Sequence, residues 1–466
     1  MTNVKNRVNQ RYLIFISLIA GMGGYLFGYD WVVIGGAKAF YEAYFSIEGI
    51  PWLQGWVMSS ALLGCLVGVV ISGWVSDKYG RKFMMILAAL IFALSAIGTG
   101  AAPTLDLFIL FRIISGVGIG IASNISPMYL SEVSPPAVRG KFVAIYQLAI
   151  VLGILSAQIA NWQIAEPVLP GEDILNSWNG QTGWRWMLWA PALPAIIYLV
   201  LIFILPESPR WLISKAHYNK ATGIFTRIAG RDYATELVDE VKKATDETLQ
   251  TVRLSQLFRG KTLKIATIGI VLAILQQWCG INVVFNYAQE IFTSAGYSVS
   301  DMLFNIVVTG IVNVVFTLVG MYTVDKWGRR SLMLMGTTGL TFIYLLLGGG
   351  YYLQLEGVVM LILVVLAIAV YAMTLAPVTW IVIAEIFPTK FRAKGMALST
   401  FALWSASFLL TYTFPLLNSS LGASGTFWLY GIICLLGLFF IKMHLPETKG
   451  KSLEEIERVI TNKRLS

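Results

Sequence analysis

The chain reads Asp77-Lys78-Tyr79-Gly80-Arg81-Lys82 at the point where one long apolar run ends and the next begins. The pattern returns 248 positions later as Asp325-Lys326-Trp327-Gly328-Arg329-Arg330. Two more signatures are duplicated in the same order, 253 and 240 positions apart: Glu132-x2-Pro135-x3-Arg139-x-Lys141 with Glu385-x2-Pro388-x3-Arg392-x-Lys394, and Pro206-Glu207-Ser208-Pro209 with Pro446-Glu447-Thr448-Lys449. Three signatures repeated at nearly one spacing indicate a duplicated unit of about half the chain.

Composition indicates an all-α polytopic membrane protein. Of the 466 residues, 57% are hydrophobic and 13% charged, which is too little polar surface for a soluble body of this size. Apolar runs reach the roughly 20 residues that cross about 30 Å of hydrocarbon. They predict twelve spans: 12–37, 53–75, 83–105, 107–131, 142–165, 187–206, 265–289, 302–324, 331–355, 357–384 and two within 395–441, divided at the polar break 418–422. Two six-helix pseudo-repeats of this kind are typical of secondary transporters.

The net charge of +9 is distributed in a way that favours a membrane orientation over nucleic-acid binding. With both termini in the cytoplasm, the cytoplasmic segments hold 30 of the 34 Lys and Arg residues. The opposite side holds only Lys38 and Arg185, while Arg112 and Lys442 fall within or at the end of spans. The positive-inside rule therefore predicts two cytoplasmic termini.

The sequence offers no residues for a cofactor or a metal. Cys65, Cys279 and Cys434 fall in predicted spans and are interpreted as small apolar residues. The two histidines, His217 and His444, are isolated, and no Gly-rich loop resembles a nucleotide cradle. Without a nucleophile and base set, an enzyme is the least favoured class.

The repeats set the predicted domain boundaries. Residues 1–205 form one six-helix bundle and residues 265–444 the other. Between them, 206–264 is the sizeable polar segment, predicted to form short amphipathic helices on the cytoplasmic side, and 445–466 is predicted to form a tail helix.

The motifs together resemble the sugar porter family of the major facilitator superfamily, over nearly the whole chain. The matching residues are Gly28-Tyr29-Asp30, the two Asp-Lys-x-Gly-Arg boxes, the two Glu-x2-Pro-x3-Arg-x-Lys boxes, Pro206 to Arg210, Gln276-Gln277-x2-Gly280-Ile281-Asn282 and Pro446 to Lys449. Within the family the chain is most similar to bacterial proton-coupled monosaccharide symporters of the xylose type. The resemblance implies the major facilitator fold and transport by alternating access.

Asp30 and Arg112 are the deep charges of the first half. A carboxylate inside a span costs about 2.5–3.5 kcal/mol by insertion scales, so it is a functional candidate by default. If its contact with Arg112 changed between states, its proton affinity would change as coupling requires. The alternative is a static ion pair that joins two spans. The resemblance implies that Asp30 is the proton site, and Arg112, as the other deep charge of this half, is its candidate partner.

Sugars are neutral polyols, so their site needs convergent amides and hydroxyls with an aromatic wall. Gln147, Gln158 and Asn161 share one helix face, as do Asn282, Asn286 and Gln289 on another. A break at Gly280 would bring Gln276 and Gln277 to the same cavity. The alternative is that these amides join helices to one another.

The resemblance assigns the sugar contacts more fully, to Phe27, Gln147, Gln276, Gln277, Asn282, Tyr287, Asn313, Trp380 and Trp404. Two residues depart from the family pattern. Asn286 stands where the family often has the first of two tyrosines, and Leu403 stands where relatives carry Gln or Asn. Because a lost amide changes hydroxyl recognition, these departures leave the identity of the sugar open.

The charged boxes are interpreted as conformational latches at the cytoplasmic ends of spans. Pairs between the halves would form when that side closes and break when it opens. The alternative is topology signalling and helix capping by the same charges. The residues concerned are Asp77, Arg81, Glu132, Arg139, Glu207, Arg210, Asp325, Arg329, Glu385 and Arg392.

The sequence and its resemblance together predict a proton-coupled symporter of a monosaccharide, a pentose or hexose with xylose as the first guess. A facilitative uniporter and a non-transporting sugar sensor are the alternatives. The expected partners are the sugar, the proton and the lipid bilayer. The expected location is the plasma membrane, a bacterial inner membrane, with each chain functional as a monomer.

Overall fold

The computed structural model describes residues 8–135, 138–168, 173–231, 234–235, 237–239, 254–258, 260–387, 391–449 and 455. Within these ranges the chain is helical and contains no strand, so the all-α prediction is confirmed. A helix satisfies every backbone N–H and C=O within its own segment. Long apolar runs can therefore cross hydrocarbon in this form.

The first half of the chain supplies ten α-helices within the described residues. They are α1 (Gln10–Gly36), α2 (Lys38–Tyr44), α3 (Pro51–Tyr79), α4 (Arg81–Ala101), α5 (Leu105–Val133), α6 (Arg139–Ile164), α7 (Trp184–Trp189), α8 (Ala192–Ile202), α9 (Pro209–Ser214) and α10 (Tyr218–Ala229). A 3-10 turn, Ile174–Asn176, and a π-turn, Asn179–Gly183, precede α7.

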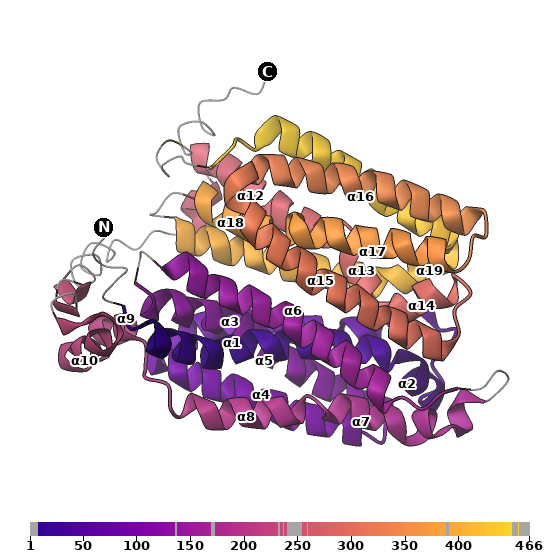
Figure 1. The fold of residues 1–466 in the computed structure, drawn as a ribbon, viewed down its shortest axis with the longest axis horizontal. Coiled ribbons are helices and arrows are strands. Elements are labelled where there is room, and N and C mark those ends of the chain that lie inside the picture. The colour runs from indigo at the N-terminus through magenta and orange to yellow at the C-terminus, as the bar shows by residue number, and fades with distance from the viewer. Residues whose placement is uncertain are drawn as a thin grey trace. The chain divides into compact units, whose positions relative to one another are not determined.

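The second half begins with a 3-10 turn, Leu254–Phe258. Its α-helices are α12 (Gly260–Trp278), α13 (Ile281–Asn286), α14 (Ala288–Thr293), α15 (Val299–Trp327), α16 (Arg329–Tyr352), α17 (Val358–Met373), α18 (Leu375–Ile386) and α19 (Arg392–His444). Figure 1 shows α15, α16 and α17 running alongside one another.

Eleven helical segments of the described chain are long and apolar enough to cross a membrane. The last of them belongs to α19, whose 53 residues would be about 80 Å long as one helix, far more than a bilayer needs. Gly422 divides it, because its φ of 68° and ψ of 172° are not helical. The count of twelve spans depends on this division, which falls in the predicted polar break.

The sixth span begins earlier than the sequence predicts. We expected it at 187–206, whereas the apolar helical segment is Asn179–Ile202. Arg185 lies inside it and donates from Nη1 to the Gly100 and Ala102 carbonyl oxygens, at 2.8 and 2.9 Å. These acceptors lie at the end of α4. The charge is therefore accommodated within the span and does not mark its boundary.

The chain forms two compact units. Unit 1 contains Met1–Trp31, Leu63–Ala157 and Arg185–Thr251, and unit 2 contains Val32–Leu62, Gln158–Trp184 and Val252–Ser466. In unit 1, α4 packs against α5 and α8. In unit 2, α19 packs against α12 and α16. The domain boundaries at 205, 264 and 444, which follow the repeats, stay predictions.

The polar segment after α8 contains short helices where the structure describes it. α9 begins at Pro209 behind an N-cap, Ser208, whose Oγ accepts from the Trp211 amide. α10 is amphipathic and buries Ala221, Phe225 and Ile228. Residues 240–253 of the predicted polar segment lie outside the described residues, as does most of the predicted tail helix over 445–466 beyond Lys449, apart from Glu455.

Candidate functional site

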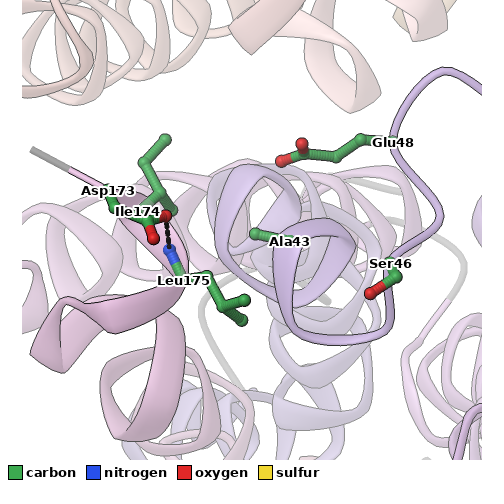
Figure 2. Close-up of a pocket in the computed structure, with 6 residues that line it drawn as sticks. All are labelled: Ala43, Ser46, Glu48, Asp173, Ile174 and Leu175. Carbon is green, nitrogen blue, oxygen red and sulfur yellow. Dashed lines mark hydrogen bonds between the residues drawn. The ribbon is translucent and has the colours of Figure 1, made fainter. Parts of the chain in front are cut away.

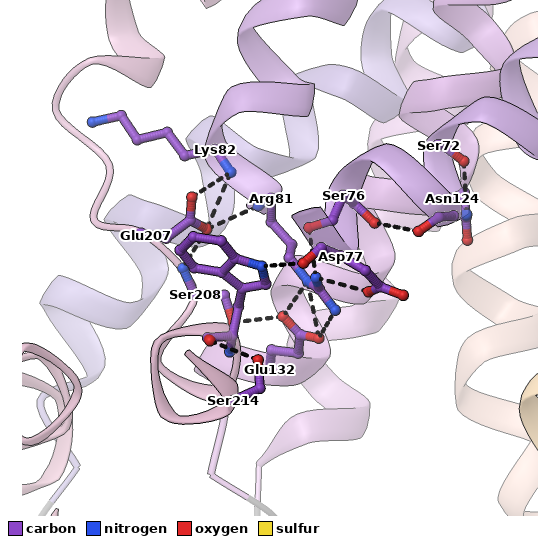
Figure 3. Close-up of polar contacts among 12 residues, drawn as sticks. Ser72, Ser76, Asp77, Arg81, Lys82, Asn124, Glu132, Glu207, Ser208 and Ser214 are labelled. Carbon is purple, nitrogen blue, oxygen red and sulfur yellow. Dashed lines mark hydrogen bonds and ion pairs between the residues drawn. The ribbon is translucent and has the colours of Figure 1, made fainter. Parts of the chain in front are cut away.

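The three duplicated signatures meet at one place in unit 1, which Figure 3 shows. Gly80 separates α3 from α4 with a φ of 98°, and the Glu207 carboxylate covers the start of α4. Glu207 Oε1 accepts from the Arg81 and Lys82 amides at 3.0 and 3.2 Å. A carboxylate at a helix N-terminus satisfies free N–H groups and favours the helix dipole.

The Arg81 side chain joins the second signature to this cap. Its Nε lies 3.0 Å from Glu132 Oε2, and its Nη1 lies 3.2 Å from Asp77 Oδ1. Ser208 Oγ donates to the same Glu132 carboxylate at 2.5 Å. The residues 77–82, 132 and 207–208 are thus one polar cluster, which we call the first box cluster.

Unit 2 repeats this arrangement as the second box cluster. Glu447 accepts from the Arg329 amide at 2.9 Å and from the Arg330 amide at 3.1 Å. Arg329 Nη2 lies 3.3 Å from Glu385 Oε1, and Thr448 Oγ1 donates to Glu385 Oε2 at 2.6 Å. The duplication in the sequence is therefore a duplication of one three-part structure.

The other predicted latch residues lie at helix ends. Arg139 is the first residue of α6, Arg392 is the first of α19, and Arg210 is the second of α9. Asp325 lies in the last turn of α15. Within each unit the contacts of Glu207 and Glu447 with backbone amides support helix capping, and the predicted pairs between the halves stay a prediction.

Asp30 and Arg112 meet deep inside unit 1. The side chains are 5% and 3% exposed, and Arg112 Nη1 lies 3.1 Å from Asp30 Oδ2. Ser115, one helical turn after Arg112, donates to the same oxygen at 2.6 Å. Arg112 Nε is buried and has no hydrogen-bond partner among the described residues. The contact is thus monodentate. A bidentate Arg–carboxylate pair would fix the two helices more firmly.

The predicted amides of unit 2 form a hydrogen-bonded chain. Asn282 donates to Gln277, Gln277 Nε2 donates to Gln276 Oε1 at 2.5 Å, and Gln276 Nε2 donates to the Tyr371 hydroxyl at 2.7 Å. Gly280, with a φ of 84°, interrupts the helix between Gln277 and Asn282. The predicted break is present and brings Asn282 back to Gln277, which a straight helix would not do.

The remaining predicted sugar contacts belong to both units. Unit 2 holds Tyr287, Asn313 and Trp404, all buried, and the half-buried Trp380. Unit 1 holds the half-buried Phe27 and Gln147. Tyr287 lies between α13 and α14 and donates from its hydroxyl to the Thr411 carbonyl at 2.7 Å.

Three further amide side chains in unit 2 are incompletely satisfied. Gln158 is 2% exposed, and neither its Oε1 nor its Nε2 has a hydrogen-bond partner within the described ranges. The same is true of Oδ1 in Asn161 and Asn286. An unmet buried amide group costs about 1–3 kcal/mol, so such groups fit a polyol or water better than a dry interior.

Comparison with known proteins gives this geometry a family. The family model described as "Sugar (and other) transporter" matches residues 16–460. The chain belongs to this sugar transporter family. It is a multi-pass membrane protein of the major facilitator superfamily.

Several relatives of this sugar transporter match it over nearly their whole length. It is 37% identical over 449 residues to the arabinose-proton symporter of Bacillus subtilis (strain 168), covering 96% of this chain and 95% of that protein. It is 36% identical over 485 residues to the D-xylose-proton symporter of Escherichia coli (strain K12), covering 97% of each.

Solved structures match the transporter equally well. The proton:xylose symporter XylE bound to 6-bromo-6-deoxy-D-glucose is 35% identical, with a TM-score of 0.82 over 97% of this chain and 99% of that one. An inward open conformation of the xylose transporter XylE from E. coli is 33% identical, with a TM-score of 0.84 over 96% of this chain and 100% of that one.

A surface pocket on the transporter is separate from these groups. It has a volume of about 570 Å³ and is lined by residues from the end of α2, the loop after it and the segment before α7: Ala43, Ser46, Glu48, Asp173, Ile174 and Leu175 (Figure 2). No predicted sugar contact lines it.

Sequence reasoning missed several partners in this sugar transporter. Ser115 lies three residues after Arg112, a helical spacing that could have placed it beside Asp30. Tyr371 lies in an uncharged span and carries no such signal. Lys38 was noted only as a charge on the outer side, although it is the centre of a buried ion cluster.

Proposed function

We propose that this sugar transporter couples the entry of a monosaccharide, a pentose or hexose, to the entry of a proton. The observation that carries the proposal is the buried Asp30, which is held by one guanidinium nitrogen and one hydroxyl. The names of its relatives, which include arabinose, xylose and galactose-proton symporters, support the same chemistry.

Asp30 is the proposed proton site and Arg112 its switching partner. A proton on Asp30 removes the charge that Arg112 faces, so the attraction across the 3.1 Å contact weakens. Because Arg112 Nε has no hydrogen-bond partner within the described residues, the guanidinium can bind another acceptor once its contact with Asp30 is broken. Proton binding thereby favours one arrangement of the helices over another, which is what coupling requires.

The amide chain of unit 2 is the proposed centre of sugar recognition. Gln276, Gln277 and Asn282 now bind one another and Tyr371, and sugar hydroxyls would exchange with these bonds one for one. Tyr287, Asn313, Trp380 and Trp404 are the proposed further contacts in this unit, with Trp380 and Trp404 as the aromatic wall for the C–H side of the ring. Phe27 and Gln147 are the proposed contacts from unit 1.

We also propose that the box clusters act as latches during alternating access and that they lie on the cytoplasmic side. The excess of Lys and Arg in the predicted cytoplasmic segments supports this orientation, with both termini inside. The proposed setting is a bacterial inner membrane, in which a single chain carries the whole pathway.

Asp30→Asn tests the coupling step in proteoliposomes. We expect the variant to lose accumulation of labelled sugar against its gradient and to keep exchange of internal for external sugar, because Asn cannot take up and release a proton. Asp106→Asn is the matched control, since Asp106 is an exposed aspartate in the first turn of α5, the helix that carries Arg112. Uphill uptake by Asp30→Asn at the rate of the control would refute the proposal.

A further inference from the structure

A second ion cluster lies in unit 2, outside the candidate spans; Lys38 and Glu42 are buried in it and Glu290 is partly exposed. Lys38, the first residue of α2, is 2% exposed, and its Nζ lies 2.8 Å from Glu42 Oε1. The same Nζ contacts Glu290 Oε1 of α14, and Gln54 Nε2 donates to Glu42 Oε2 at 2.9 Å. We call Lys38, Glu42 and Glu290 the outer cluster. The helix α15 begins shortly after α14 and ends at the second box cluster, so the outer cluster lies toward the opposite end of α15 from the second box cluster.

The charges of the outer cluster shift one another's pKa values. Burial alone would lower the pKa of Lys38, but the two carboxylates beside it outweigh burial and raise it, so this lysine keeps its charge. Burial raises the pKa of Glu42, and Lys38 offsets part of that rise. A charged lysine is almost never wholly buried unless it is paired, so Lys38 depends on Glu42 and Glu290 for its position.

The surrounding backbone is packed tightly at the same place. A Cβ on Gly35 would lie 3.1 Å from the Asn286 carbonyl oxygen. The Ala39 amide donates to Gln289 Oε1 at 2.8 Å. Lys38 Nζ also lies 5.6 Å from the centre of the Tyr287 ring, one of the proposed sugar contacts. The cluster therefore lies beside the helix break that carries Tyr287.

The two sides of this contact come from different sequence repeats. α2 follows the first span of the first half, whereas α13 and α14 complete the first span of the second half. A transporter in which the halves move against each other must separate such contacts when this end opens. An ion cluster is suited to that task, because its groups need one another while they are desolvated and regain water as partners once this end opens.

We propose that Lys38 is a positioning residue that holds α2 against α14 through Glu42 and Glu290, and so keeps Tyr287 in place while this end of the bundle is closed. The inference rests on the proposed transport function, since only a transport cycle requires the cluster to break. Among the predicted sugar contacts, Lys38 lies near Tyr287, and its ion-pair partners are Glu42 and Glu290.

Cysteine labelling tests the cluster without sugar or a proton gradient. Ala288→Cys in α14 replaces a residue that is 5% exposed, and the three native cysteines are buried, so background labelling is low. In lipid nanodiscs, where both faces are accessible, we expect Lys38→Met to raise the rate of maleimide labelling at position 288 by at least about five-fold. Lys38→Arg keeps the charge and should label slowly.

Glu290→Gln should also label faster than its matched control, Glu48→Gln, which changes an exposed glutamate in the loop after α2. The double variant Lys38→Glu with Glu290→Lys restores opposite charges and should return to slow labelling. In transport assays, Lys38→Met should lower kcat and Lys38→Arg should recover it.

Equal labelling of Lys38→Met and the Ala288→Cys parent would overturn the inference, as would fast labelling of Lys38→Arg. If the double variant does not fold, the comparison of Lys38→Met with Lys38→Arg decides alone. A protein that moves no monosaccharide against a gradient, yet shows the expected labelling, would refute the proposed function and keep the closure role of Lys38.

Discussion

Glu207 and Glu447 hold matching positions in the two box clusters, but their surroundings act on them in opposite directions. Burial raises the pKa of Glu207 in spite of three backbone N–H groups that bind its carboxylate. Burial also acts on Glu447, but there the N–H groups of Lys449, Arg329, Arg330 and Thr448 prevail and lower its pKa. The two caps therefore differ in how they respond to acid.

This difference predicts opposite pH dependence for two equivalent substitutions. The folded chain binds the Glu207 proton more tightly than the unfolded chain, so this carboxyl makes the fold less stable as the pH rises. For Glu447 the folded pKa is lowered, so its stabilisation is present above the ordinary pKa and is lost as the pH falls through the lowered value.

The measurement is the melting temperature of the parent minus that of each variant, followed from neutral pH down to about pH 4, near the ordinary pKa of Glu. With rising pH we expect this difference to shrink for Glu207→Gln and to grow for Glu447→Gln. A change of the same sign in both variants would contradict the assignment.

For single residues, the sequence predicted interaction partners only where helical spacing or an unusual residue type pointed to them. Asp30 and Arg112 stand out because charges are rare in apolar spans, and the structure brings them together. Lys38 and Glu290 are both unremarkable near span ends, and they are more than 250 positions apart. A single sequence contains no signal that joins two such residues.

Among the elements, α19 shows how one residue sets a boundary. Gly422 is exposed, and an added Cβ would meet no atom within 4 Å, so space does not require glycine there. Its backbone conformation requires glycine, because other residues rarely adopt a φ of 68° with a ψ of 172°.

Gly422→Ala is therefore expected to destabilise the protein by about 1–3 kcal/mol or to shift the kink. Gly349→Ala is the matched control, since that glycine lies in helical α16 and also has open space around its Cβ position. There the same change should be neutral or stabilising by up to about 1 kcal/mol. Melting temperatures of the two variants in nanodiscs make the comparison. A Gly422→Ala protein as stable as Gly349→Ala would show that the kink does not depend on glycine.

The elements were predicted well where polarity marked their ends. The break near Gly422 follows from the polar residues 418–420. The sixth span was misplaced because Arg185 looked like a boundary, whereas carbonyl oxygens at the end of α4 accept its guanidinium. A charge therefore marks a span end only when no acceptor is available inside the span.

For the whole molecule, the apolar runs predicted the all-α membrane fold, and the duplicated signatures with the single-copy motifs predicted the family. They did not predict that Val32–Leu62 and Gln158–Trp184 belong to the same compact unit as the second half. That grouping rests on contacts between residues far apart in the chain, and a repeat pattern carries no signal for such contacts.

The central claim concerns the whole cycle, that sugar entry is coupled to proton entry. The direct measurement is uptake of labelled xylose, arabinose, glucose and galactose into proteoliposomes, with and without an inward proton gradient. We predict accumulation of at least one of these sugars above equilibrium, and its collapse when the gradient is dissipated. If the sugar only equilibrates, at a rate that does not depend on the proton gradient, the account is contradicted, and Asp30 and Arg112 are then a structural ion pair.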